Sequence, residues 1–393
     1  MNGPVQDPRG GSPGRAEGAA RRAPSRDGGG WVDWLEQRIN LTEIFSFITH
    51  FGLVYTPVDT SRPVREVVHQ VTHQRVPAYA RWPRVLGLLA AILFGLQVVT
   101  GVLLAYYYRP TPDAAFESTR TIVRDLAAGW FIHQMHAWGA WLLVVVIVLR
   151  LLRLFWDGLY RAPREILWWS AVAMAWLVLQ LDFTGHLLAW DSHSYWTTVR
   201  GMEVVFALPI VGPILVFLLG GRVMNEDVLI RFYILHLLVL PLFFAVFLYF
   251  TFATLRRVGL SPAPAGAGAG TTAFRDHSYS MLMLTALLFG ALVTLATLLP
   301  FRFQGMADPY TTPGGVRPPW YMLAPYALFQ RAPGPAWLSG LVLVALAFAV
   351  LLLPLWVRGG DDAGSRRRTR LWGGVALLAW IALSVAGAFL DRR

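Results

Sequence analysis

The chain has 393 residues, of which 55% are hydrophobic and only 15% are charged. That balance is too apolar for an ordinary soluble domain, and it predicts an all-α polytopic membrane protein. The sequence contains no cysteine, which excludes disulfides, thiolate-bound iron–sulfur clusters and haem attached through thioethers. The net charge of +11 comes from arginine, since lysine is absent, and it gives no reason to expect a nucleic-acid partner.

The first 83 residues are expected to precede the membrane spans. Residues 1–30 are rich in Gly, Pro, Arg and Ser, a composition typical of a disordered tail. Between residues 31 and 50, apolar side chains recur at helical spacing among charged ones, which predicts one amphipathic helix on the membrane surface. A polar connector follows and completes the segment 31–83.

Seven stretches are apolar and long enough to cross a hydrocarbon core of about 30 Å: 85–107, 130–155, 167–189, 231–255, 280–300, 337–357 and 371–390. The low-complexity run 262–270 interrupts them after the fourth. We therefore expect a four-helix transmembrane bundle over 84–260, a linker over 261–279, and three further transmembrane helices over 280–393.

Arginines are most frequent before the first stretch and after the second, fourth and sixth, for example Arg62, Arg161, Arg256 and Arg366. The positive-inside rule makes these segments cytoplasmic. It predicts a multi-pass protein of a bacterial inner membrane with a cytoplasmic N-terminus and an external C-terminus.

Two histidines lie inside predicted spans. His136 is near the external end of the second and His236 is near the external end of the fourth. A histidine is costly within a membrane and marks a candidate functional site. Facing helices could place these imidazoles on both axial positions of one haem iron, which suits electron transfer. Two core histidines hydrogen-bonded across helices fit the spacing equally well.

Several motifs occur in the order found in one family. They are Leu86-Gly87, Gln97, Thr100-Gly101, Tyr107-Tyr108-Arg109-Pro110, Gly129-Trp130, His136-Ala137-Trp138, Phe183-Thr184-Gly185, Trp190-Asp191, Tyr195-Trp196, the segment from Pro209 to Pro213, and Arg231-Phe232-Tyr233 with His236 and Pro241. Residues 31–260 thus resemble the cytochrome b subunit of quinol-oxidising bc complexes, nearest the b/b6 version. The last three spans resemble its companion subunit IV, through Ala307-Asp308-Pro309 and Pro318-Pro319-Trp320-Tyr321.

The resemblance implies one non-covalent haem b held by His136 and His236, with Gly101, His133 and Arg231 around it. In the family each of these two helices carries a second ligating histidine about 14 or 15 residues further on, close to four turns or about 21 Å along the same face. Those positions are Arg150 and Thr251 here, neither of which is a usual haem ligand. The cytoplasmic-side haem is therefore expected to be missing.

The vacated cytoplasmic volume is expected to be filled by Arg150, Trp168 and Trp169, with Arg150 reaching a carbonyl, a carboxylate or a lipid phosphate. Gly87, a glycine of the kind that the family keeps beside a haem, is retained on the cytoplasmic side. It argues against the loss of that haem. A second cofactor held by His69, His73 or His277 is an alternative, although His69 and His73 also fit a solvated helix face.

The family oxidises quinol beside a Pro-Glu-Trp-Tyr motif whose carboxylate accepts a proton. Here Pro319 stands in place of the glutamate, while Trp320 and Tyr321 can still shape a quinone pocket. The candidate proton acceptors after the third span are Asp182, His186, Asp191 and His193, of which we favour His186 and Asp191. These residues could instead only hydrogen-bond loops at the membrane interface.

Two functions remain open on the sequence. The first is an electron-transfer subunit that oxidises membrane quinol and passes electrons to a Rieske iron–sulfur protein or a c-type cytochrome, in a multi-subunit complex that could be dimeric. The second is a degenerate cytochrome b that serves as a non-catalytic scaffold for redox partners. A transporter has only the number of spans in its favour.

Overall fold

The computed structural model describes residues 31–36, 38–51, 58–80, 85–219, 221–259, 270–357 and 363–389. The predicted tail 1–30 and residues 261–269 of the predicted linker lie outside these ranges. The chain divides into two compact units, Met1–Leu41 and Thr42–Arg393. The first unit contributes one short helix, α1 (Trp31–Glu36), and the second contains the bundle.

The remaining elements, in chain order, are α2 (Leu41–Thr49), α3 (Val64–His73), β1 (Arg75–Pro77), α4 (Leu86–Ala105), α5 (Pro112–Arg124), α6 (Gly129–Trp156), α7 (Glu165–Leu188), α8 (Ser192–Phe206), α9 (Val211–Leu219), α10 (Glu226–Ile234), the π-helix η1 (Leu235–Val239), α11 (Leu240–Val258), β2 (Thr271–Ala273), α12 (Phe274–Leu298), the 3-10 helix η2 (Trp320–Met322), α13 (Leu323–Arg331), α14 (Ala336–Leu351), α15 (Leu353–Trp356) and α16 (Ala363–Ala388). The fold is all-α apart from one short ribbon.

The single amphipathic helix predicted over 31–50 is wrong, because the segment forms two helices. The amides of Arg38 and Ile39 both donate to the carbonyl of Leu35, which makes a turn after α1. Asn40 directly precedes α2, and asparagine favours helix starts over helix interiors because its side chain competes for backbone groups.

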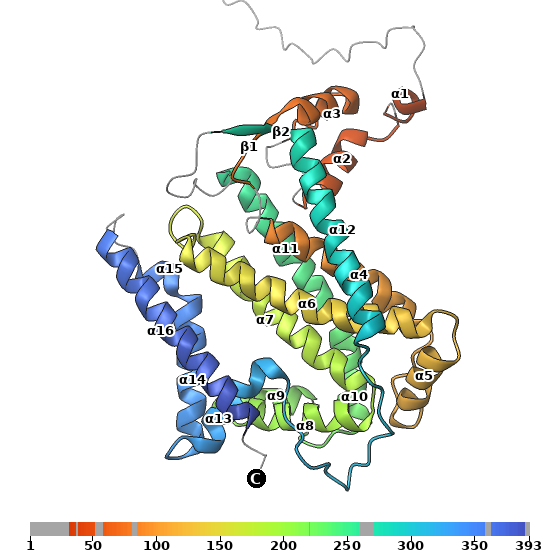
Figure 1. Ribbon diagram of the computed structural model, residues 1–393, viewed down its shortest axis with the longest axis vertical. Helices are drawn as coiled ribbons and strands as arrows, with labels where there is room; N and C mark the ends of the chain where they lie inside the picture. The colour runs from red at the N-terminus through yellow and green to blue at the C-terminus, as the bar shows by residue number, and fades with distance from the viewer. Residues whose placement is uncertain are drawn as a thin grey trace, which may run out of the picture. The chain divides into compact units, whose positions relative to one another are not determined.

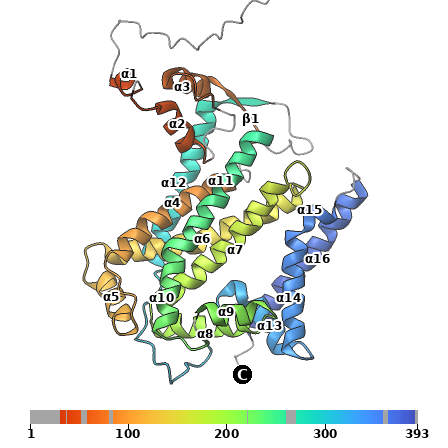
Figure 2. The ribbon, with the colours of Figure 1, turned by 180° about the vertical axis from the view of Figure 1, so that it is seen from behind.

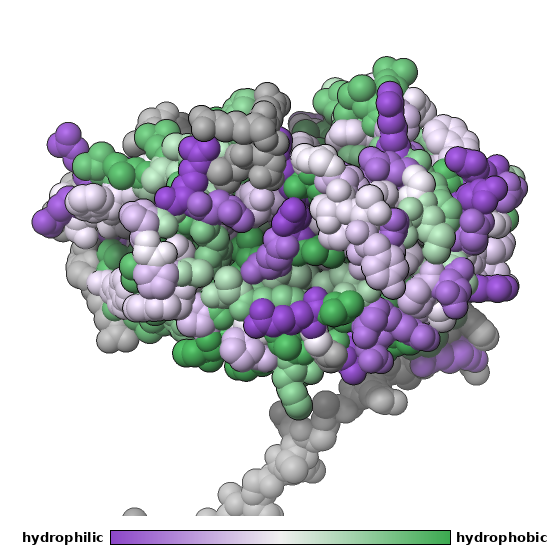
Figure 3. Space-filling view, turned by 90° about the horizontal axis from the view of Figure 1, so that it is seen from below, coloured by the Kyte–Doolittle hydropathy of each residue, from purple (hydrophilic) through white to green (hydrophobic). Residues whose placement is uncertain are grey.

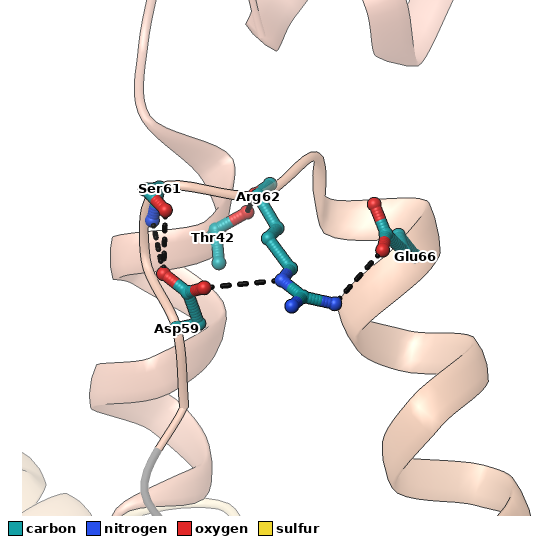
Figure 4. Close-up of polar contacts among 5 residues, drawn as sticks. All are labelled: Thr42, Asp59, Ser61, Arg62 and Glu66. Carbon is teal, nitrogen blue, oxygen red and sulfur yellow. Dashed lines mark hydrogen bonds and ion pairs between the residues drawn. The ribbon is translucent and has the colours of Figure 1, made fainter.

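A polar network fixes the connector ahead of α3 (Figure 4). The Asp59 carboxylate accepts from the Ser61 hydroxyl at 2.6 Å and from Arg62 Nε at 3.0 Å, and Arg62 Nη1 lies 3.0 Å from Glu66. The hydrogen bonds from Ser61, with a smaller contribution from Arg62, lower the pKa of Asp59. Thr42 then donates to the Arg62 carbonyl at 2.8 Å, which ties α2 to this turn.

The bundle consists of α4, α6, α7 and the continuous α10–η1–α11 (Figure 1). Its core is a cluster of aliphatic and aromatic side chains, including Leu93, Val144, Met174 and Phe244, all under 2% exposed. Strands β1 and β2 pair antiparallel, with Val76 opposite Thr272. We call the end of the bundle at β1 and β2 the ribbon end. The opposite end, where α8 lies, is the α8 end, and hydrophilic side chains are spread across it (Figure 3).

Helix α12 packs on α6, and α14 lies against α7 (Figure 2). The Gln134 side chain accepts from the Phe301 amide at 2.8 Å and donates to the Phe301 carbonyl at 2.9 Å. Trp138 Nε1 donates to the Leu299 carbonyl at 3.0 Å. Polar side chains of α6 therefore satisfy the backbone where α12 ends, as burial of those groups requires.

Six helices, not the predicted seven, are long and apolar enough in the described part of the chain to cross a membrane. The exception is α14, which ends at Leu351 because Pro354 cannot donate to the Val350 carbonyl four residues earlier. Trp168 Nε1 donates to that carbonyl at 2.9 Å, and Trp169 Nε1 donates to the Leu351 carbonyl at 3.0 Å. The two tryptophans, which we expected to fill a vacated haem volume, thus donate to the backbone where α14 ends.

We expect Trp168→Phe to lower the free energy of unfolding by about 1–3 kcal/mol, because the buried Val350 carbonyl loses its donor in apolar surroundings. Trp176→Phe is the control, since Trp176 lies on the same helix but is 55% exposed. Denaturant unfolding of both variants in detergent measures the difference. Equal losses of stability in the two variants would contradict the capping role.

Candidate functional site

The imidazoles of His136 on α6 and His236 on η1 face one another near the α8 end of the bundle. Their ring centres are 6.2 Å apart and their planes are inclined by 70°. Metal–imidazole bonds of about 2.0–2.1 Å, with each nitrogen about 1.1 Å from its ring centre, put the centres of two axial imidazoles about 6.2–6.4 Å apart. The two rings are thus spaced for one metal ion between them.

Each imidazole is held by its Nδ1 atom. Thr100 Oγ1 lies 2.9 Å from His136 Nδ1 and itself donates to the Leu96 carbonyl at 2.7 Å, so it is free to accept. His236 Nδ1 lies 3.0 Å from the Leu181 carbonyl and 3.4 Å from Thr184 Oγ1. Protons on both Nδ1 atoms leave both Nε2 lone pairs available, which is the tautomer that metal-bound histidines adopt.

Glycines make room for the rings. A Cβ atom on Gly101 would lie 3.1 Å from His136 Cε1, and one on Gly185 would lie 2.5 Å from His236 Cε1. Each glycine follows the threonine that holds the same ring. The repeated Thr-Gly pair is therefore a signal in the sequence for both ligand sites, which the motif analysis did not use in this way.

His236 lies in a π-helical turn ahead of Pro241. The Leu240 amide donates to the Leu235 carbonyl, five residues earlier. Pro241 has no N–H to donate to a backbone carbonyl in the preceding turn of the helix. π-Helical turns of this kind are frequent at functional sites. The turn changes the direction of His236 relative to a regular helix.

Two side chains on the helices of these histidines each have a buried nitrogen without a partner in the described part of the chain. They are His133, through Nδ1, and Arg231, through Nη1. His133 lies one turn before His136, and Arg231 lies five residues before His236. Buried donors without partners are rare, and these two suit an anionic group such as a haem propionate.

The ribbon end of the same helices is different. Arg150 is 4% exposed, and its Nη2 atom donates to Thr251 Oγ1 at 3.3 Å. Thr251 is fully buried and lies 3.6 Å from the sulfur of Met174. The partner of Arg150 is thus a hydroxyl, not the carbonyl, carboxylate or phosphate that we expected. The two positions that lack histidines contact each other directly.

Gly87 does not leave space for a cofactor here. A Cβ atom on Gly87 would lie 3.6 Å from both Arg150 Nε and Phe252 Cζ, so these side chains cover the glycine. His50 stacks on Tyr249 beside this cluster, with ring centres 4.4 Å apart. Burial lowers the pKa of His50, so its imidazole is neutral near pH 7.

Three other histidines lie at the ribbon end, on α3 and α12. His69 and His73 stack on each other at 4.0 Å on an exposed face of α3, as the solvated-face interpretation expects. His277 is buried at the start of α12. Arg150 and Thr251 occupy the two positions where the family resemblance predicts a second ligand pair.

A second group of candidate residues meets near the α8 end. Tyr321 of η2 donates to Asp182 Oδ2 on α7 at 2.9 Å. Trp320, which is 43% exposed, lies 6.0 Å from the ring of Trp141 on α6. The structure thus brings the Trp-Tyr pair of the C-terminal region against the two central helices of the bundle.

His186 and Asp191 have different surroundings. His186 Nε2 is buried without a partner, and its ring lies 5.6 Å from that of the exposed His193. Asp191 caps α8 by accepting from the Ser194 amide at 2.8 Å, and its other oxygen accepts from the Gln304 amide at 2.8 Å. Backbone donors occupy both carboxylate oxygens, so the loop-bonding interpretation accounts for Asp191.

Comparison with known proteins agrees with this geometry. The family Cytochrome b/b6/petB matches residues 71–259, and Cytochrome b(C-terminal)/b6/petD matches residues 306–392. Cytochrome b6 of Heliomicrobium gestii is 39% identical over 177 residues, which cover 45% of this chain and 83% of that protein. The chain belongs to the cytochrome b/b6 family. The match with cytochrome b6 of Gracilaria tenuistipitata var. liui is 34% identical and covers 53% of this chain and 98% of that one.

A solved structure described as "Hyperthermophilic respiratory Complex III" is similar in fold, with a TM-score of 0.63. It is 21% identical in sequence, and the match covers 92% of this chain and 99% of the other. Membership of the cytochrome b/b6 family implies haem binding. The residues of the α8 end fit a bis-histidine haem, whereas those of the ribbon end, with Arg150 bonded to Thr251, do not.

We expect Thr100→Val to weaken haem affinity by about 10- to 100-fold, because His136 Nδ1 loses the hydroxyl that orients its ring. Thr184→Val should have a smaller effect, since His236 Nδ1 keeps the Leu181 carbonyl at 3.0 Å. Haem retention in competition with apomyoglobin measures both. A larger loss in the Thr184 variant would contradict the assigned roles.

Arg150→Met should leave haem content unchanged and raise the free energy of unfolding by about 1–4 kcal/mol, because it replaces a buried charge with an apolar chain of similar length. Arg150→Ala should instead lower it by about 2–5 kcal/mol through the cavity it leaves. Denaturant unfolding with haem spectra distinguishes these outcomes. Loss of haem in the methionine variant would mean that Arg150 belongs to a cofactor site.

Proposed function

We propose that this chain is an electron-transfer subunit that oxidises membrane quinol, with a single b-type haem held by His136 and His236. The observation that carries the proposal is the contrast between the two ends of one helix pair. At the α8 end the rings are 6.2 Å apart, with each Nδ1 hydrogen-bonded. At the ribbon end the corresponding positions are an arginine and a threonine in contact.

A bis-histidine haem supplies a one-electron acceptor without an open coordination site. The protein supplies the rest of the site. Thr100 and the Leu181 carbonyl fix the two imidazoles, and His133 and Arg231 offer buried donors toward anionic propionates. Trp320 and Trp141 offer aromatic faces for a flat quinone ring.

The α8 end is proposed to be the external side, since arginine is most frequent in the segments at the ribbon end. Electrons from quinol would leave on that side to a Rieske iron–sulfur protein or a c-type cytochrome in a multi-subunit complex. Without a ribbon-end haem, the second electron path across the membrane is absent from this chain. A proton-translocating quinone cycle would then need a cofactor from another subunit.

The alternative is a scaffold that anchors redox partners without turnover. Two observations favour it: Pro319 replaces the carboxylate of the quinol motif, and Arg150 with Thr251 fills one ligand site. The paired threonine and glycine supports around His136 and His236 favour the electron-transfer function, since a scaffold has no use for them.

A pyridine haemochrome assay on the purified protein should give one haem per chain, and His136→Ala should abolish the bound-haem spectrum. His73→Ala is the matched control, because His73 is exposed on α3 and should leave haem content at one. Two haems per chain, or a normal spectrum in the His136 variant, would refute the single-haem proposal.

A further inference from the structure

Asp182 is a carboxyl group within a helix that is long and apolar enough to span a membrane. No basic side chain forms an ion pair with it in the described part of the chain. An acidic residue in such a place is costly and by default functional. The residue is half-buried and not completely enclosed by protein.

The partner of Asp182 can serve both protonation states of the carboxyl. Tyr321 Oη lies 2.9 Å from Asp182 Oδ2 and 3.4 Å from the Leu179 carbonyl. A hydroxyl has one hydrogen and can also accept. When Asp182 is ionised, Tyr321 donates to it. When Asp182 is protonated, it can donate to Tyr321, whose hydrogen turns to Leu179, so no polar group is left unpaired.

Tyr321 keeps its proton throughout this exchange. Burial raises the pKa of its hydroxyl well above the ordinary value, and the nearby Asp182 carboxylate adds to that shift. The tyrosine is therefore a hydrogen-bond partner and not a competing acid. Within this pair, Asp182 is therefore the group left to accept a proton.

Asp182 also lies beside both parts of the proposed site, the imidazole of His236 and the aromatic pair of Trp320 and Trp141. It follows Leu181, whose carbonyl holds His236 Nδ1 at 3.0 Å. Through Tyr321 it is next to Trp320, whose ring lies 6.0 Å from Trp141. A quinol against these aromatic faces would be close to a proton acceptor and to the imidazole support at once.

A path for the proton leads from Asp182 to water. His186 lies one turn further along α7, and residues four apart share a helix face about 5–6 Å apart. Its Nε2 is buried without a partner, and the ring of the exposed His193 follows at 5.6 Å. His193 belongs to α8, at the end of the bundle across which hydrophilic side chains are spread (Figure 3).

We propose that Asp182, held by Tyr321, accepts the proton that quinol loses, and that His186 and His193 carry it to the surface. The inference rests on the proposed quinol oxidation and names the residue for its acid–base step. Asp182 on α7 would thus accept the quinol proton, which Pro319 of the Pro-Pro-Trp-Tyr motif cannot accept because it has no ionisable side chain. Asp191, with both oxygens bonded to backbone amides, is left as a structural cap.

The step is a proton transfer and needs no oxidant of its own. The O–H bond of the quinol breaks and leaves its electron pair on the quinol oxygen. A new O–H bond forms on the Asp182 carboxylate, which becomes neutral. The quinol anion is then the species oxidised by the one-electron acceptors of the proposed function.

The test is pre-steady-state haem reduction by a short-chain quinol in the haem-loaded, full-length protein. Asp182→Asn should slow it by about 100-fold or more, as loss of a general base does. Adding Pro319→Glu to Asp182→Asn should raise the reduction rate again by at least about tenfold, because it places a carboxylate in the Pro-Pro-Trp-Tyr motif on the opposite side of the quinol. Asp113→Asn, an exposed change on α5, is the control and should leave the rate unaltered.

A second measurement follows the carboxyl itself. The infrared difference spectrum on quinol addition should gain a protonated carboxyl band in the unaltered protein and not in Asp182→Asn. His186→Phe should keep the first, fast haem reduction but slow steady-state turnover with an added electron acceptor by about tenfold or more. That pattern would separate the acceptor from the exit path.

The outcomes distinguish the two proposals. If the unaltered, haem-loaded protein is not reduced by quinol, the proposed function fails, and this inference fails with it. If it is reduced and Asp182→Asn is reduced equally fast, Asp182 is not the acceptor although the proposed function stands. Unchanged turnover in His186→Phe would overturn the exit path.

Discussion

A polar group inside a membrane-spanning bundle must find its partner within the protein, because hydrocarbon offers none. This constraint explains contacts that otherwise look unrelated. The Trp168 indole bonds a carbonyl freed by a proline, Thr100 bonds the outer nitrogen of His136, and Tyr321 bonds a lone carboxylate. In each case the donor comes from a different helix, so the same contacts that satisfy polar groups also set how the helices pack.

The two ends of the central helices differ in how polar side chains are held between α6 and the helix that faces it. Around His136, the Thr100 hydroxyl orients the imidazole by a hydrogen bond, and Gly101 leaves room for the ring because it has no Cβ atom. Around Arg150, the side chain turns inward, bonds Thr251 and lies over Gly87, so the space closes with protein atoms. Arg150 and Thr251 fill this space together because their side chains contact each other directly.

Sequence reasoning was reliable where the signal is local. Apolar length located six of the seven predicted spans, and the depth of His136 and His236 in their spans predicted that their rings would face each other. It failed where a partner is distant in the chain. The carbonyl at the end of α14 accepts from Trp168, 182 residues away, and the partner of Asp182 is Tyr321, 139 residues away. The ribbon was missed for the same reason, since neither of its three-residue strands has a periodic pattern long enough to predict alone.

The pairing of β1 with β2 also determines where the backbone could be cut without separating the two halves of the protein. Strand β1 lies before the first bundle helix and β2 lies just before α12, so their pairing brings together the beginnings of the two halves. The tryptophans on α7 and the contacts of Gln134 add two further points of attachment. A backbone cut between Gly259 and Gly270 would break none of these bonds. The two halves could then be expressed as separate polypeptides that bind each other and reassemble. The peptide link between them would serve only to supply the two halves in a one-to-one ratio.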